Sequence, residues 1–187
     1  MIKLNLGCGN RRLDGFVNVD KYASAAADQV VDLEKTPWPW ATSSVSEVRF
    51  IHSLEHMGEA SETYLDIIRE TYRICAHGAT VVIHVPHPRH DNYLGDPTHV
   101  RPITEQQFLL FDKQLNDQWK ATGSCAATPL GHYLDVDFAT TGSVAVLESQ
   151  YHARLISGEL TNEQMDRMAR ELNNVIAEMH ITLTVRK

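Results

Sequence analysis

The chain has 187 residues, enough to bury the core of one domain but few for two. Its 43% hydrophobic and 22% charged residues are typical of a globular protein, and no apolar run approaches the roughly 20 residues of a membrane span. Acidic residues outnumber basic ones by 24 to 17, and the formal net charge of −7 disfavours nonspecific binding to nucleic acid.

Three cysteines, Cys8, Cys75 and Cys125, lie far apart and form no CxxC motif, which indicates reduced thiols. The first residues lead directly into a predicted strand rather than into a signal peptide. We therefore expect a cytoplasmic protein without a membrane segment, built as a single domain over residues 1–187.

Strands and helices alternate in the first half of the chain, which predicts an α/β sheet. Short apolar or β-branched runs predict strands at residues 2–6, 16–20, 29–33, 48–51 and 79–85. We expect the last of these to be central and buried on both faces of the sheet. Alternating prolines make residues 36–40 a loop, and one apolar face predicts a helix over residues 61–76 that Gly78 ends.

The middle of the chain is less regular. Residues 86–103 hold four prolines and form a long loop, a feature that is often functional. Thr104 caps a short helix that runs to about residue 111, and residues 112–131 show no clear pattern. We expect residues 86–131 to form a lid or substrate region inserted after the fifth strand.

The C-terminal part combines strands with one amphipathic helix. Residues 133–138 and 143–147 predict strands, or a hairpin around Thr141-Gly142, and residues 181–185 predict a closing strand. A capping box at residues 161–164 starts the helix. Its apolar stripe consists of Met165, Met168, Leu172, Val175 and Met179. We expect this stripe to dock on the protein's own sheet, with a homodimer interface as the alternative.

A glycine turn near the N-terminus points to a ligand. Residues 4–10 read Leu-Asn-Leu-Gly-Cys-Gly-Asn, and Gly7 and Gly9 let a ligand approach the backbone closely. The next strand ends at Asp20, whose carboxylate can accept both hydroxyls of a ribose. Asp20 follows Gly9 by only 11 residues and a third glycine is missing, which disfavours a nicotinamide dehydrogenase. The pattern predicts a pocket for an adenosine-containing ligand.

This opening resembles that of class I S-adenosylmethionine-dependent methyltransferases of a small bacterial or phage type. Three later segments are also similar to the family. Residues 31–34 resemble its third-strand segment, and residues 51–56 resemble its Leu-Glu-His signature after strand four. Residues 69–86 resemble its next helix and fifth strand. The resemblance implies a single-domain Rossmann-like methyltransferase fold. Its sheet would be twisted and mostly parallel with an antiparallel C-terminal strand, and its cofactor S-adenosylmethionine.

The resemblance also assigns residues to the cofactor. They are Gly7, Cys8 and Gly9 (methionine and ribose), Asp20 (ribose hydroxyls), Lys21 (beside the adenosine), Asp32 and Leu33 (adenine), and His52 and Ser53 (below the sulfonium). Asn5 stands where the family usually has an acidic residue, so it adds no charge to pair with the cofactor's ammonium group.

Residues 84–104 are rich in histidine and would cover the acceptor in a methyltransferase of this kind. A neutral histidine can take a proton from an attacking hydroxyl or amine near neutral pH. The candidate catalytic residues are His99 and His56, with Asp96 to orient a histidine and Arg101 to hold an anionic group. His84 alternates with apolar neighbours on a predicted strand and is expected to be structural.

We therefore expect methyl transfer to an O or N atom of a small-molecule or peptide-sized acceptor, with a histidine of residues 84–104 as general base. DNA amino-methylation and cytosine C5 methylation are disfavoured because the sequence lacks Asn/Asp-Pro-Pro-Tyr/Phe and Pro-Cys.

Two alternatives stay open. The first is a metal-dependent hydrolase, lyase or oxygenase centred on the same loop. Metal binding is not favoured, and its ligands would be His87, His90, His99 and Asp96. The second is a non-catalytic protein that binds S-adenosylmethionine.

Overall fold

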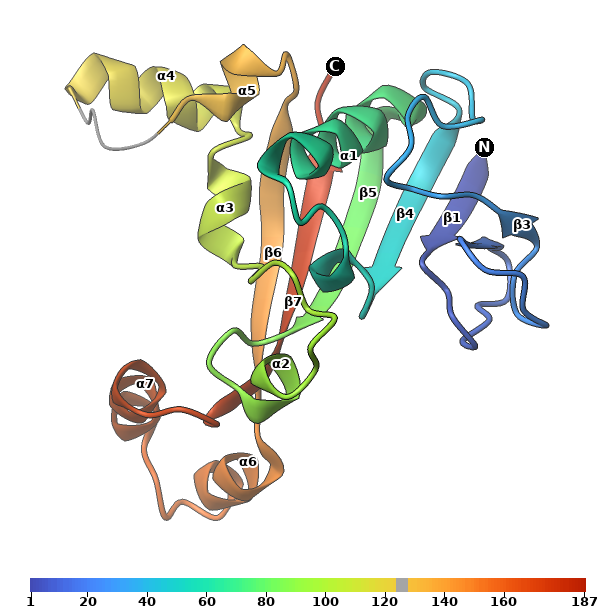
Figure 1. Ribbon diagram of the computed structural model, residues 1–187. Helices are drawn as coiled ribbons and strands as arrows, with labels where there is room; N and C mark the ends of the chain where they lie inside the picture. Colours follow the sequence, from blue (N-terminus) through green and yellow to red (C-terminus); the bar gives the residue numbers. More distant parts are fainter. Residues whose placement is uncertain (124–127) are drawn as a thin grey trace.

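A computed structural model describes residues 1–123 and 128–187 of the chain. Its centre is a seven-stranded sheet in the order β3-β2-β1-β4-β5-β7-β6 (Figure 1). The strands are β1 (Ile2–Leu6), β2 (Val17–Asp20), β3 (Gln29–Val30), β4 (Val45–Ile51), β5 (Cys75–Pro86), β6 (Phe138–Leu147) and β7 (Ile176–Val185). The first five are parallel, whereas β7 runs antiparallel to both β5 and β6. The predicted α/β sheet, mostly parallel with an antiparallel C-terminal strand, is confirmed.

The helices are short apart from one that packs on the sheet. They are the 3-10 turn η1 (Leu54–His56), α1 (Ser61–Ile74), α2 (Asp91–Leu94), α3 (Glu105–Leu109), α4 (Lys113–Thr122), α5 (Leu130–Tyr133), α6 (Ser149–Ile156) and α7 (Asn162–Glu171). In the part of the chain that the structure describes, no helix is both long and apolar enough to cross a bilayer.

Several predicted boundaries in the first half are wrong. Strands β4 and β5 begin earlier than predicted, and Gly78 lies within β5 instead of ending the helix. The helix predicted to run to residue 76 ends at Ile74, because the backbone from Cys75 onwards pairs with β4. The strand predicted over residues 29–33 ends at Val30, since the chain turns at Asp32, whose carboxylate accepts the backbone N–H of Glu34.

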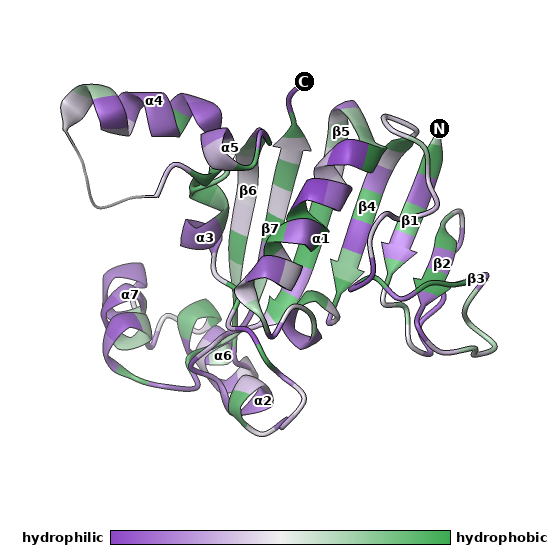
Figure 2. Ribbon diagram, turned by 45° about the horizontal axis from the view of Figure 1, so that its top comes forward, coloured by the Kyte–Doolittle hydropathy of each residue, from purple (hydrophilic) through white to green (hydrophobic). Residues whose placement is uncertain are grey.

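One face of the sheet carries the main core. Phe50 of β4 and Ile83 of β5 meet Ile68 of α1 and Phe108 of α3 on this face. Figure 2 shows the resulting alternation of hydrophobic and hydrophilic residues along β4 and β5. The side chains that point the other way are half-buried, among them Arg49, Thr80, Val82, His84 and Thr182. The prediction that residues 79–85 are buried on both faces is therefore wrong, because no described helix covers this polar face of the sheet.

The C-terminal half differs most from its prediction. Residues 138–147 form one long strand with a bulge between Thr140 and Gly142, rather than a hairpin, because the whole segment pairs with β7. Residues 130–133 are helical, and α4 occupies a segment predicted to be irregular. Asp112 caps α4 by accepting the backbone N–H of Leu115, a signal that pattern reading missed.

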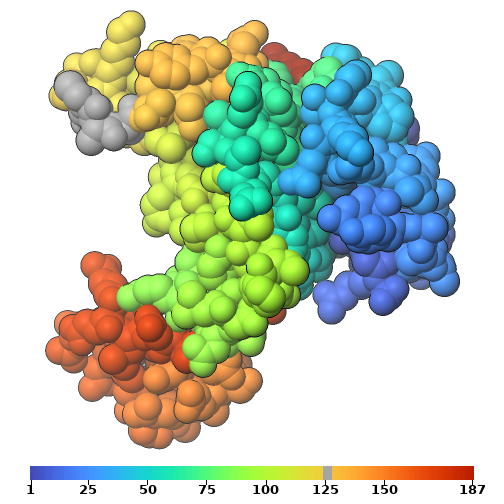
Figure 3. All heavy atoms as spheres, viewed as in Figure 1, coloured from blue at the N-terminus to red at the C-terminus, as the bar shows by residue number. Residues whose placement is uncertain are grey.

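Helices α6 and α7 form a small lobe beyond the end of the sheet, drawn in orange and red in Figures 1 and 3. The capping box of α7 is present, with Thr161 and Gln164 bonded to each other's backbone N–H. The helix ends at Glu171, and Met165 packs with Leu160 and Val175 in a separate cluster. Met165, Met168 and Val175 of the predicted stripe therefore pack within the lobe, whereas Leu172 is exposed and Met179 belongs to β7 and packs against the main core.

The Pro-Trp-Pro-Trp loop is fastened to α1 by a buried charge pair. Glu70 accepts the backbone N–H of Trp38 at 2.6 Å and two hydrogen bonds from Arg73. The Arg73 guanidinium also donates to the carbonyl oxygens of Trp38 and Trp40. The indole N–H of Trp38 donates to the carbonyl oxygen of Leu33, so this loop supports the segment that follows β3.

We expect Glu70→Ala to lower the free energy of unfolding by about 2 to 3 kcal/mol, because it leaves the buried N–H of Trp38 without an acceptor and removes the ion pair with Arg73. Glu70→Gln keeps an acceptor oxygen and should lose roughly half as much. Urea denaturation of both variants measures the difference, and equal stability of Glu70→Ala and the wild type would contradict the role of this pair.

Candidate functional site

The glycine turn after β1 is held by buried amides. The Asn5 amide donates to the carbonyl oxygen of Arg11 and to the side-chain oxygen of Asn18, at 3.0 and 2.9 Å. Asp28 accepts the backbone N–H and the side-chain amide of Asn18, and the backbone bond, together with the Arg12 guanidinium, lowers the pKa of Asp28 to about 2. Asn5 is almost fully buried. Asn5 thus holds the turn in place through hydrogen bonds that its side-chain amide donates, and these bonds require no charge.

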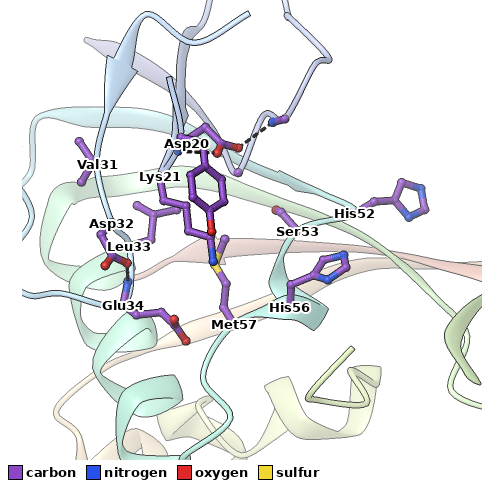
Figure 4. A pocket seen from close by; sticks show the side chains of 13 residues that line it. Asp20, Lys21, Val31, Asp32, Leu33, Glu34, His52, Ser53, His56 and Met57 are labelled. Atoms are coloured by element: carbon purple, nitrogen blue, oxygen red, sulfur yellow. Dashed lines mark hydrogen bonds between the residues drawn. The ribbon is translucent and has the colours of Figure 1, made fainter. Parts of the chain in front are cut away.

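A cavity of about 300 Å³ opens above this turn. It is lined by Gly7, Gly9, Asp20, Lys21, Tyr22, Val31, Asp32, Leu33, Glu34, His52, Ser53, His56 and Met57. Figure 4 shows the segment from Val31 to Glu34 on one side and His52 and His56 on the other. Eight of the nine residues assigned to the cofactor line this cavity. Cys8 does not, because its side chain points into the protein and is buried.

Asp20 and Asp32 present carboxylates at the rim of this cavity. The two oxygens of Asp20 accept the backbone N–H groups of Gly9 and Tyr22, at 2.8 and 2.9 Å. Each oxygen keeps a second lone pair, so a ribose hydroxyl can still bind. Lys35 lies 3.1 Å from Asp32 and holds the pKa of that carboxyl below its usual range.

The floor of the cavity joins β1 to β4. The Ser53 hydroxyl donates to the carbonyl oxygen of Leu6 at 2.7 Å. A Cβ atom added to Gly7 would lie 2.4 Å from the Cβ of Ser53, so only glycine fits there. Glu34 closes the far side by accepting the backbone N–H of Gly58 at 2.7 Å. These contacts bring segments from four parts of the chain around one space.

His52 and His56 also line a second cavity of about 270 Å³. Its other lining residues are Glu55, Pro86, Asn92, Asp96, His99 and Glu178. His52 has a left-handed backbone with φ of 53°, directly after β4, which places its side chain at the border of both cavities. Burial lowers the pKa of both His52 and His56. Neutral imidazoles therefore separate the two spaces.

Two histidines in the second cavity have defined tautomers. His99 Nδ1 lies 2.8 Å from the carbonyl oxygen of Tyr93, which can only accept, so Nδ1 carries the hydrogen. The Thr98 hydroxyl donates to Asp96 at 2.6 Å and so accepts from His56 Nδ1 at 2.9 Å. In the neutral form of each ring the lone pair is then on Nε2. The ring centres lie 4.5 Å apart.

Glu55 is the most unusual group of the site. Its side chain is 1% exposed, and neither carboxylate oxygen has a hydrogen-bond partner. Burial raises its pKa to about 7. The backbone carbonyl of Glu55 accepts the N–H groups of Val100 and Arg101, which holds the loop after β5 against η1. A buried carboxylate without a partner is rare in native proteins and calls for an explanation.

The structure groups a different set of metal-ligating residues from the predicted one. Among the described residues, only Glu55, His56 and His99 form a group of three whose ligand atoms all lie within 4.8 Å of one another. His90 pairs with Glu148, the residue directly before α6, and His87 accepts the backbone N–H of Arg89. These histidines lie outside the second cavity. His99 and Asp96 of the predicted set do line it.

Arg101 lies elsewhere than its predicted role requires. Its guanidinium donates to the carbonyl oxygen of Gly58 and lies 4.4 Å above the Tyr64 ring, so it lines neither cavity. His84 stacks on His180 of β7 at 3.6 Å, on the polar face of the sheet. Burial, together with His180, lowers the pKa of His84 to about 4.

Pro86, Asn92, Asp96 and His99, from the first part of the predicted lid or substrate region (residues 86–131), line the second cavity. Residues 86–103 pass over the carboxyl ends of the parallel strands, whereas α4 and α5 lie at the opposite end (Figure 1). Arg186 at the end of β7 pairs with Asp112 and Asp137 there, beside the amino end of β5. Residues 124–127, and with them Cys125, lie outside the described residues. Cys8 and Cys75 are free thiols.

Sequence reasoning missed several lining residues. Glu55 stands directly before His56 in the Leu-Glu-His signature, and this position was the available signal. Glu178 reaches the site because β7 pairs in register with Pro86 of β5, which no local pattern reveals. Tyr22, Glu34 and Met57 likewise enter only through folding.

A scan of protein-family models and a search of curated proteins give no match. The chain is similar in structure to a SAM-dependent methyltransferase from Archaeoglobus fulgidus, with a TM-score of 0.57 and 17% identity over 98% of this chain and 86% of that one. A SAM-dependent methyltransferase from Methanosarcina mazei matches with a TM-score of 0.54 and 12% identity, over 98% and 92% of the two chains. The chain has the class I S-adenosylmethionine-dependent methyltransferase fold.

The methyltransferase fold does not by itself decide the reaction. The [4+2]-cyclase SpnF also matches, with a TM-score of 0.52 and 14% identity over 98% of this chain and 74% of that one. The chemistry therefore has to be argued from the residues of the two cavities.

The two glycines of the turn allow a matched test of the close approach to Ser53. Gly7 and Gly9 both have left-handed backbones, but a Cβ on Gly9 would meet nothing within 4 Å. We expect Gly9→Ala to destabilise the protein by about 1 to 2 kcal/mol through backbone strain alone. Gly7→Ala should lose about 1 to 3 kcal/mol more through overpacking. Equal losses in urea denaturation would show that the contact with Ser53 is not tight.

Glu55 should make stability depend on pH. Its pKa of about 7 in the folded protein exceeds the ordinary value of 4.5, so the folded state resists ionisation. The wild type should therefore lose roughly 2 to 3 kcal/mol relative to Glu55→Gln as the pH rises from 5 to 8. Urea denaturation with a chelator present measures this difference. Glu62→Gln, at an exposed position, is the control, and a pH-independent difference would contradict the buried charge.

Proposed function

We propose that this protein transfers a methyl group from S-adenosylmethionine to an O or N atom of a small-molecule or peptide-sized acceptor. The observation that carries this proposal is that the two cavities share His52 and His56. A donor in the first cavity and an acceptor in the second would meet at this border. Methyl transfer needs chiefly such an alignment of the acceptor atom with the sulfonium methyl.

The first cavity suits the donor. Asp20 would accept the ribose hydroxyls through the lone pairs that its two backbone contacts leave free. Asp32 and Leu33 would contact the adenine, with Lys21 beside the adenosine. The methionine part would then extend over the glycine turn towards His52 and Ser53, which places the sulfonium near the border. The similarity to methyltransferases in fold supports this orientation.

The second cavity suits a polar acceptor. His99 Nε2 carries a lone pair and belongs to the loop of residues 84–104, so it is the proposed general base. His56 lies beside it, and Asp96 orients His56 through the Thr98 hydroxyl. None of these observations favours a hydrolase, lyase or oxygenase, or a non-catalytic binding protein, over methyl transfer. A cytoplasmic location and the small bacterial or phage type stay predictions.

Calorimetry with S-adenosylmethionine and S-adenosylhomocysteine tests the donor site. We expect Asp20→Ala to bind both at least about tenfold more weakly than the wild type, the roughly 1.4 kcal/mol of a lost ribose contact. Asp14→Ala removes an exposed acidic residue nearby and should bind normally. Asp20 also accepts a hydrogen bond from Gly9 of the glycine turn, so circular dichroism checks that Asp20→Ala leaves the fold intact. Failure of the wild type to bind either compound would overturn the proposed function.

A further inference from the structure

We propose that Glu55, His56 and His99 bind one divalent transition-metal ion at the acceptor side of the site. This metal site rests on the proposed function and deepens it, because the ion would hold the acceptor next to the methyl donor. Two imidazoles and one carboxylate favour ions such as Zn²⁺, Fe²⁺, Co²⁺ or Mn²⁺ over Mg²⁺ and Ca²⁺, which prefer oxygen ligands.

The three ligand atoms are already gathered. They lie within 4.8 Å of one another, whereas ligands about 2.1 Å from a tetrahedral ion stand roughly 3.4 Å apart. Rotation of the side chains by small angles closes this difference. Glu55 and His56 are neighbours on η1, and His99 is brought to them by the two N–H groups that the Glu55 carbonyl accepts. Backbone hydrogen bonds therefore assemble the group before any ion arrives.

Both histidines are oriented as metal ligands usually are. A ligating imidazole typically donates its other N–H to a carbonyl or to a carboxylate-linked group, which fixes the tautomer. His99 Nδ1 donates to the Tyr93 carbonyl, and His56 Nδ1 donates to Thr98, which is bonded to Asp96. Each Nε2 is thereby left with a lone pair for the ion. The Tyr93 ring, stacked on His99 at 5.1 Å, restrains that imidazole further.

Glu55 supplies an independent observation. Its carboxylate is buried and has no hydrogen-bond partner, although it lines the second cavity and His52 Nδ1 lies 3.8 Å from one of its oxygens, beyond hydrogen-bond distance. Leaving such a group unpaired costs free energy, which a bound cation would offset. Hydrogen bonding within the fold does not explain this residue, whereas a metal ion beside its oxygens does.

The surrounding charge also fits a cation. Asp96 and Glu178 line the same cavity as Glu55, and the lining includes no lysine or arginine. With three protein ligands, an ion has coordination positions left for an oxygen or nitrogen of the acceptor. The ion and a proton compete for the lone pair of His99 Nε2. With the ion bound, lowering the pKa of a coordinated hydroxyl would replace proton uptake by His99 as the means of activation.

Metal binding can be measured on tag-free full-length protein after treatment with a chelator. Titration with Co²⁺, followed by calorimetry and visible absorption, should show one ion per chain and the d–d bands of a low-coordinate site. Glu55→Gln and His99→Asn should each weaken binding at least about tenfold. Thr98→Val, which removes the hydroxyl between His56 and Asp96 and keeps all three ligands, should weaken it about 10- to 100-fold.

His87→Asn is the matched control, because it removes a histidine of the same loop outside the group and should bind Co²⁺ normally. No binding by the wild type, or equal binding by the wild type and Glu55→Gln, would overturn the metal site. Binding of S-adenosylhomocysteine measured in chelator separates the two claims. If the wild type binds S-adenosylhomocysteine but not Co²⁺, only the metal site is overturned. If the wild type binds Co²⁺ but not S-adenosylhomocysteine, only the proposed function is overturned.

Discussion

The close approach of β1 to the segment after β4 is the contact on which the rest of the site depends. Gly7 packs so closely against Ser53 that a side chain at position 7 would clash with it. The Ser53 hydroxyl donates a hydrogen bond to the carbonyl oxygen of Leu6. Because both strands are parallel, their carboxyl ends meet at one edge of the sheet. This single contact places the glycine turn beside His52 and so joins the two cavities.

The loop after β5 is anchored to the same place by its backbone rather than by its side chains. The Glu55 carbonyl accepts two consecutive N–H groups, and Arg101 reaches past it to the carbonyl of Gly58. Gly58 in turn donates to Glu34, on the far wall of the first cavity. A continuous chain of hydrogen bonds therefore runs from Glu34 in the first cavity to the histidine loop. It explains why a proline-rich segment with only one turn of helix can hold His99 in position.

The site contains groups that lower the stability of the fold. The Glu55 carboxylate is buried without a hydrogen bond, and His52 has a left-handed backbone. Asn5 with Asn18 and Glu70 with Arg73 are paired, whereas Tyr64, Gln107, Thr140 and Arg186 also contain a buried atom without a hydrogen bond. Glu55 differs from these four because its unbonded group is a carboxylate that lines a cavity.

The sequence by itself determined the strand segments of the first half, the glycine turn and the capping box of α7, because each depends on neighbours within a few residues. It could not determine that residues 138–147 form one strand, since pairing with β7 decided between strand and hairpin. Nor could it separate His99 from His87 and His90, which lie in the same loop and look alike in sequence. Only the tertiary structure sets His99 beside Glu55 and His56, because backbone bonds to a residue 44 positions earlier bring them together.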